Sequence, residues 1–298
     1  MLVIILWHVL GYHSVLTDPW VMPIFFFIAG YFWKPNVSFR GFWGHKLKKL
    51  ILPLACFSIP AFILLCFKIW HTHDWHPVIK LLSPYDSIIC GGWFIPCMLM
   101  AYLSYWVADR MFEDEKYRWL IVICFSIIGY TLDNLCIKGH KVVLPFYINT
   151  ALFVMVFMEV GRLVRLLENR YQVNLFSLLK FRISSVVLFF IALYLLGSKP
   201  LDLIWSDYQG AYWGVVVLEG ILGICALLSL LSVVKNYPPP PFAYIGRQSL
   251  GMLLLHGYVI DLLVVGGVER NICLYLLTVV ITLLGVKLIE LTIPKILP

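Results

Sequence analysis

The chain has 298 residues, of which 61% are hydrophobic and only 13% are charged. Charged residues make up about 25% of a typical soluble domain, and the mean hydropathy of this chain is +0.90. A soluble protein needs more polar surface than this composition supplies. The composition therefore argues against a water-soluble enzyme, a nucleic-acid-binding protein or a disordered chain, and it predicts an integral membrane protein embedded in lipid.

Apolar runs separated by short polar stretches predict an all-α fold, a single bundle of about ten transmembrane helices that forms one domain over residues 1–298. A membrane-spanning helix needs about 20 predominantly apolar residues. The eight cysteines form no CxxC pair, and they are interpreted as small packing residues. The predicted spans cover residues 1–16, 20–33, 50–67, 92–108, 119–132, 145–160, 183–197, 213–234, 248–265 and 272–291.

The orientation follows from the distribution of Lys and Arg. If the N-terminus lies in the cytoplasm, most of the 23 basic residues fall on the cytoplasmic side of the ten predicted spans. Cytoplasmic loops of membrane proteins carry such an excess of Lys and Arg. We therefore expect both chain ends in the cytoplasm, and we attribute the net charge of +7 to this bias.

The first apolar run, LVIILWHVLGYHS, contains His8 and His13. His8 lies about 13 Å along a helix from the loop at Thr17, close to mid-membrane. A polar side chain at that depth is costly and often functional, although a histidine that merely bonds a neighbouring helix explains its position equally well. A signal peptide would begin with a basic region, but no charged residue precedes this run. We therefore do not interpret the run as a signal peptide, and we expect the cytoplasmic start of the first helix to be missing.

The second run, WVMPIFFFIAGYF, contains Pro23 and Gly30. A proline within a span frees a backbone carbonyl group, and a glycine allows two helices to approach closely. We expect a kinked, closely packed helix here.

A basic segment, FRGFWGHKLKKLILP, spans residues 39–53 and supplies Arg40, Lys46, Lys48 and Lys49. One interpretation is an interfacial helix that lies on anionic lipid. The other is a clamp for a phosphate-bearing cytosolic donor, because Lys and Arg suit phosphate. The two interpretations are compatible.

A predicted outer loop, HTHDWHP, gathers His71, His73, Asp74 and His76. Histidine and aspartate are zinc ligands, but the spacing matches no structural zinc pattern. We expect a solvated loop that meets a sugar or a lipid head group, and no metal.

The segment YIGRQSLGMLLLH brings Arg247 to the cytoplasmic end of a span, and His256 lies one and a half to two turns deeper than Ser249, seven residues after it. His256 is either a hydrogen-bonded buried imidazole or a group that orients a substrate. Glu159, Glu219, Asp261 and Glu290 also lie within or at the edges of spans, where they are neutral, paired or exposed to a cavity.

Together these segments resemble the acyltransferase-3 family of bacterial membrane O-acyltransferases. LVIILWH is similar to the family's LLVVLGH, VMPIFFFIAGYF to HMPLFFFLSGYF, and YIGRQSLGMLLLH to GxxSLxxYLLH. HKLKKLILP, GGWFIPCML and FVMVFMEVGRLVR resemble further family segments in the same order. The resemblance covers nearly the whole chain, and the family's His before MP and Ser before GY are Val21 and Ala29 here.

The resemblance implies an acyl-CoA donor, often acetyl-CoA, and transfer to a hydroxyl group of a cell-surface glycan or its lipid-linked precursor. The family signature, a basic residue followed after ten residues by a histidine, identifies His8 as its histidine. The basic partner would precede Met1. Arg40, Lys46, Lys48 and Lys49 become candidates for binding the CoA phosphates, with Arg162, Arg165 and Arg247 as weaker candidates.

The predicted function is therefore O-acylation, most simply O-acetylation, of a bacterial glycan in the cytoplasmic membrane. His8 is the expected general base, since an imidazole accepts a proton near neutral pH; a transient acyl carrier is the alternative. His256 and Arg247 are expected to contact substrate. Two other hypotheses stay open: a transporter or flippase for a lipid-linked glycan, although no internal repeat is visible, and a non-catalytic family member.

Overall fold

The computed structural model describes residues 1–11, 16–34, 38–72, 93–112, 114–137, 144–196, 212–234 and 240–292, except for the side chains of some positions within helices. Within these ranges the chain forms helices and no strands, which confirms the all-α prediction. It folds into two compact units, and each is built from segments that are distant in the sequence.

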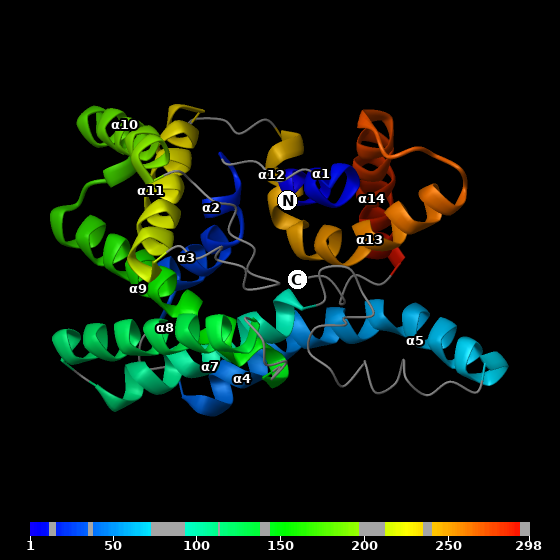
Figure 1. The fold of residues 1–298 in the computed structure, drawn as a ribbon, viewed down its shortest axis with the longest axis horizontal. Coiled ribbons are helices and arrows are strands. Elements are labelled where there is room, and N and C mark those ends of the chain that lie inside the picture. Colours follow the sequence, from blue (N-terminus) through cyan, green and yellow to red (C-terminus); the bar gives the residue numbers. More distant parts are fainter. Residues whose placement is uncertain are drawn as a thin grey trace. The chain divides into compact units, whose positions relative to one another are not determined.

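The first unit comprises Met1–Tyr12, Val37–Pro96 and Pro238–Pro298. Helices α1, α13 and α14 pack on one another in this unit (Figure 1), and α5 also packs on α13. The contact between α5 and α13 includes a hydrogen bond of 2.8 Å that the Tyr258 hydroxyl donates to the Phe57 carbonyl oxygen. The helices of this unit are α1 (Leu2–Leu10), α4 (Phe39–Lys46), α5 (Leu52–Thr72), α12 (Pro240–Arg247), α13 (Ser249–Val265) and α14 (Ile272–Thr292), with a π-helical turn at Leu47–Ile51 between α4 and α5.

The second unit comprises His13–Asn36 and Cys97–Tyr237. Helix α9 packs along α3 and α8, α10 packs along α11, and α11 also contacts α2. The helices are α2 (Asp18–Val21), α3 (Pro23–Tyr31), most of α7 (Phe94–Met111), α8 (Glu115–Ile137), α9 (Ile148–Tyr171), α10 (Leu179–Leu196) and α11 (Trp213–Leu231), with short 3-10 turns at Pro145–Tyr147, Leu175–Ser177 and Ser232–Val234.

Local sequence signals set several helix ends. Asn271 caps the start of α14, because its Oδ1 accepts hydrogen bonds from the backbone N–H groups of Cys273 and Leu274 at 2.9 and 3.2 Å. Such a cap satisfies N–H groups that have no partner within the helix. Gly11 caps the C-terminus of helix α1. Its N–H bonds the Trp7 carbonyl oxygen, and its left-handed backbone (φ 61°) turns the chain out of the helix.

The predicted kink and close approach in the second apolar run are both confirmed. The helix is interrupted at Met22, and α3 begins at Pro23. A Cβ atom added to Gly30 would overlap the Met158 carbonyl group and lie only 2.6 Å from Met158 Cα, whereas one added to Gly161 would lie 2.9 Å from Tyr31 N. Helices α3 and α9 therefore touch backbone to backbone, with a glycine on each side of the contact.

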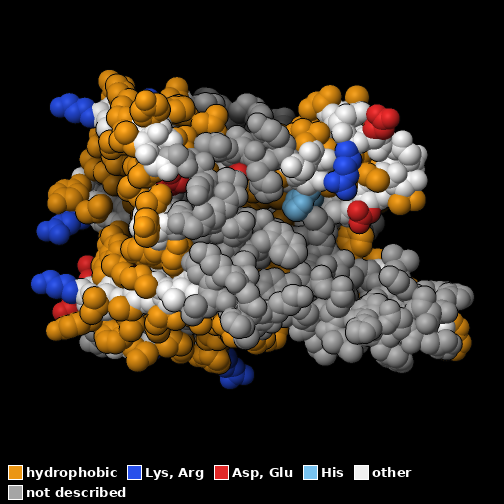
Figure 2. Space-filling view, viewed as in Figure 1, with side chains coloured by type: hydrophobic (Ala, Val, Ile, Leu, Met, Phe, Trp, Pro, Cys, Tyr) orange, Lys and Arg blue, Asp and Glu red, His pale blue; other side chains and the backbone are white. Residues whose placement is uncertain are grey.

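The surface is apolar where a soluble protein would be polar. Among the described residues, α10, α11 and α14 are long and apolar enough to cross a membrane. Helix α14 buries Leu274, Thr278, Thr282 and Val286 along one stripe, and its other faces expose large apolar side chains such as Leu284 and Leu288. Hydrophobic side chains cover much of the described surface in the face shown in Figure 2. The protein is a membrane protein whose apolar helix faces meet lipid.

Candidate active site

Two histidines that are far apart in the sequence meet in the first unit. His8 on α1 and His256 on α13 have ring centroids 5.1 Å apart, with an angle of 43° between the ring planes. Their helices pack on each other and on α14. The sequence alone predicts separate roles for the two rings, and the structure brings them into one contact.

His256 is held in a defined orientation. It is 0% exposed, and its Nδ1 lies 3.0 Å from the carbonyl oxygen of Met252, one turn earlier on α13. Because a carbonyl oxygen only accepts hydrogen bonds, Nδ1 carries the proton. In the neutral ring Nε2 is then the acceptor. His256 therefore presents an acceptor nitrogen on the ring that contacts His8.

His8 lies in the last turn of α1. Its side chain is half-buried, whereas that of His256 is fully buried, so His8 is the member of the pair that a substrate can reach. The carbonyl groups at a helix C-terminus stabilise a nearby positive charge. This position suits a histidine that takes up a proton.

The predicted basic segment also belongs to the first unit. Arg40 and Lys46 lie on α4, and Lys48 and Lys49 lie on the π-helical turn that leads into α5. Arg40, Lys48 and Lys49 are exposed, and Lys46 is half-buried. Burial, together with the smaller effect of the positive charge of Lys49, lowers the pKa of Lys46 to about 8. The segment therefore presents several cations and one lysine that loses its charge at mildly alkaline pH.

Arg247 is the last residue of α12 and is exposed. It precedes His256 by nine residues, or about 13 Å along a helix. The same helix is tied to the end of α14, because Tyr244 donates a hydrogen bond of 3.3 Å to Glu290, which also pairs with Lys287 at 2.9 Å. Arg247 thus lies at the end of the histidine-bearing segment and not beside the histidine pair.

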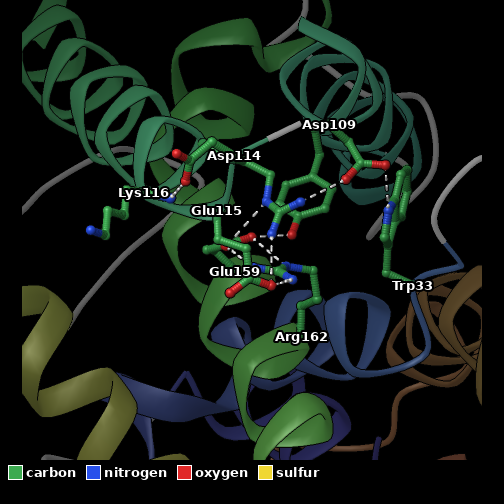
Figure 3. A network of polar contacts seen from close by, with 9 residues as sticks. Trp33, Asp109, Asp114, Glu115, Lys116, Glu159 and Arg162 are labelled. Atoms are coloured by element: carbon green, nitrogen blue, oxygen red, sulfur yellow. Dashed lines mark hydrogen bonds and ion pairs between the residues drawn. The ribbon is translucent and has the colours of Figure 1, made fainter. Parts of the chain in front are cut away.

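The second unit contains a buried ionic network (Figure 3). Glu159, at 0% exposure, accepts hydrogen bonds from Arg162 at 2.5 and 3.0 Å and from the Tyr105 hydroxyl. Arg118 lies 3.5 Å from Glu159 and 3.2 Å from Asp109. Asp109 in turn accepts a hydrogen bond of 3.2 Å from the Trp33 indole. These contacts connect α7, α8 and α9 with Trp33, two residues beyond the end of α3.

Arg162 and Arg165, the weaker candidates for binding the CoA phosphates, both have other partners in the structure. Arg162 donates hydrogen bonds to Glu159 and to Glu115. Burial alone would lower the pKa of its guanidinium, but the Glu159 carboxylate outweighs this effect and holds that pKa above the usual value. Arg165 donates a hydrogen bond of 3.1 Å to Tyr31 and lies over its ring. Both arginines therefore already have partners within the protein.

Sequence reasoning singled out Glu159 as an in-span acid but missed its partners Tyr105, Asp109 and Arg118. The spacing of Glu159 and Arg162, three residues apart on one helix, was the available signal, because residues at that spacing share a helix face. The partners on α7 and α8 come from tertiary packing. The predicted outer loop falls outside what the structure describes: nothing is placed for the side chains of His71, His73, Asp74 and His76.

The family profile described as an acyltransferase domain (acyltransferase 3) matches residues 1–290. No curated protein and no solved structure matches the chain. The matched range contains the histidine pair, the basic segment and the buried ionic network. The chain belongs to the acyltransferase-3 family and is a membrane-bound acyltransferase.

Proposed function

We propose that this acyltransferase transfers an acetyl group from cytosolic acetyl-CoA to a hydroxyl group of a cell-surface polysaccharide or its lipid-linked precursor. We place it in the cytoplasmic membrane of a bacterium, with both chain ends in the cytoplasm. The distribution of Lys and Arg supports this orientation. The proposal requires no metal ion.

The observation that carries the proposal is the contact of the His8 and His256 rings at 5.1 Å. Transfer from a thioester to an alcohol needs a base that removes the hydroxyl proton. His8 is the reachable ring, and His256 is fixed by its bond to Met252. We assign His8 as the general base and His256 as the positioning residue that orients it.

The basic segment supports the choice of donor. The phosphate groups of acetyl-CoA are attracted by clustered Lys and Arg side chains. Arg40, Lys46, Lys48 and Lys49 lie in the same unit as the histidine pair, and α5 joins them to α13 through the bond between Tyr258 and Phe57. Arg247 is a further cation at the end of α12. Donor binding by this segment is part of the proposal.

The test measures transfer of radiolabelled acetyl from acetyl-CoA into the glycan fraction of membranes that carry this chain. His8→Ala should lower the initial rate about 10²- to 10⁴-fold, the usual contribution of a general base. His13→Ala, which changes the other histidine of the predicted first span, is the matched control and should stay within a few-fold of the unsubstituted rate. An unaltered rate in His8→Ala would refute the assignment of the base.

A second variant tests the role of His256. His256→Gln keeps a polar side chain but removes the imidazole that contacts His8. We expect a lower kcat and an altered pH–rate profile, with little change in KM for acetyl-CoA, because His8 loses its orienting partner. A purely structural role would alter the amount of folded protein and leave the pH–rate profile of the remainder unchanged.

A further inference from the structure

Two threonine hydroxyls are buried without a hydrogen-bond partner in the first unit. Thr278 and Thr282 are each 0% exposed, and neither Oγ1 has a hydrogen-bond partner among the described residues. They lie four residues apart, on the buried stripe of α14. Buried polar groups are normally hydrogen-bonded because an unmade bond costs free energy. Two such hydroxyls on one stripe therefore need an explanation.

Other threonines of the chain show the usual solution. Thr292, on the same helix, donates to the Leu288 carbonyl oxygen at 2.9 Å, and Thr131 donates to the Ile127 carbonyl oxygen at 2.8 Å. The hydroxyl of a threonine in a helix often bonds the carbonyl group one turn earlier in this way. Thr278 and Thr282 do not make this bond, so their hydroxyl groups are available to a different acceptor.

The neighbours of α14 are the two helices that carry the histidine pair. Helix α14 packs on α13 and on α1 (Figure 1), and its buried stripe is the face that these contacts cover. A Cβ atom added to Gly285 would lie 2.7 Å from Leu255 Cδ2, which fixes the level at which α13 and α14 meet. Leu255 directly precedes His256, and Thr282 lies one turn from Gly285. Measured along the helix axes, Thr282 on α14 and His256 on α13 therefore lie within about one helical turn of each other.

We propose that the Thr282 hydroxyl donates a hydrogen bond to the carbonyl oxygen of the acyl group during transfer. This inference rests on the proposed function. The acyl group enters beside the half-buried His8 and gives the hydroxyl the partner that it lacks. Thr278, about 6 Å outward along α14, adds a second hydroxyl to the same wall of the site.

Transfer passes through a tetrahedral oxyanion. His8 takes the proton of the acceptor hydroxyl while the acceptor oxygen forms a bond to the acyl carbonyl carbon. The carbonyl oxygen becomes an oxyanion, which Thr282 stabilises. The carbonyl bond then re-forms, the carbon–sulfur bond breaks, and the leaving thiolate receives the proton from His8. Donors that are aimed at a developing oxyanion lower the barrier of such a step.

The experiment compares Thr282→Val with Thr282→Ser in the acetyl-transfer assay. Valine keeps the shape and removes the donor, so kcat should fall about 10²- to 10³-fold, as for other oxyanion donors, with KM for acetyl-CoA unchanged. Serine retains the hydroxyl and should recover most of kcat. Thr292→Val is the matched control, because that hydroxyl bonds its own helix, and it should keep the unsubstituted kcat.

Thermal unfolding separates this role from a structural one. Thr282→Val removes an unsatisfied buried hydroxyl, so its Tm should equal or exceed that of the unsubstituted protein while kcat falls. Unsubstituted kcat in Thr282→Val, or a fall in kcat that only tracks a lower Tm, would overturn the inference and leave the proposed function intact. If the unsubstituted protein transfers no acetyl group, or if His8→Ala transfers it at the same rate, both the inference and the proposed function are overturned.

Discussion

The contact between α3 and α9 leads to a quantitative prediction for Gly30→Ala. The added methyl group would overlap the Met158 carbonyl group and lie 2.6 Å from Met158 Cα. Carbon atoms pack at about 3.5 Å or more, so the contact with Cα alone requires the two backbones to separate locally by about 0.9 Å, and the closer carbonyl group requires more. No side-chain rotation relieves this overlap, because the obstructing atoms belong to the backbone of α9.

The magnitude follows from two opposing effects. Overpacking costs about 1–3 kcal/mol, and the upper end applies because a backbone must move. Alanine recovers up to about 1 kcal/mol through its better helix propensity. The free energy of unfolding should therefore fall by about 2 kcal/mol. At about 2–4 °C per kcal/mol for a large domain, the Tm falls by about 4–8 °C.

The assay is thermal unfolding of the purified protein in detergent, with Gly214→Ala as the control. Gly214 also lies in a helix, but a Cβ atom added there meets nothing within 4 Å. The Tm of Gly214→Ala should be unchanged or slightly higher. A Tm for Gly30→Ala equal to or above that of the unsubstituted protein would show that the two helices do not meet at this glycine.

Two further predictions concern charge. Glu159→Gln leaves Arg118 and Arg162 buried without their shared carboxylate and should cost about 3–5 kcal/mol of stability, measured as a lower Tm or yield of folded protein. Glu115→Gln, whose side chain is 60% exposed, should cost less than about 1 kcal/mol, and equal effects of the two would contradict the buried network. Because the pKa of Lys46 is lowered to about 8, its charge is present below that pH and is lost above it. Affinity for CoA, measured by calorimetry, should fall as pH rises through about 8 and persist to higher pH in Lys46→Arg; identical pH profiles would exclude Lys46 from the donor site. The same lowered pKa means that the folded state binds fewer protons than the unfolded state, so this group makes stability rise between about pH 8 and pH 10.5.

The sequence predicts the features that composition and local spacing determine. Apolar runs predict the helices, Pro23 predicts the break before α3, and Gly30 predicts a close helix contact. His8 stands out because a histidine is rare within an apolar run. Each of these signals lies within about one helix length of sequence.

The sequence does not reveal which distant groups meet. The contact of His8 with His256 joins the two ends of the chain, and the pairing of Arg118 with Glu159 depends on how α8 and α9 are rotated about their axes. Thr282 carries no signal of its own, because a threonine in an apolar helix normally bonds its own backbone. Only the packing of α14 on α1 and α13 makes the partnerless hydroxyl visible.

The buried ionic network has a consequence for how the protein is made. Arg118 can pair with Asp109 as soon as α8 is synthesised, because Asp109 precedes it by nine residues on α7. Arg162 and Glu159 arrive together on α9, so each part of the network carries its own counter-charge before the parts meet. An uncompensated charge is what makes a helix costly to release into lipid, so these helices can leave the insertion machinery one after another, and a nascent chain arrested between α8 and α9 should resist extraction from the membrane by alkali.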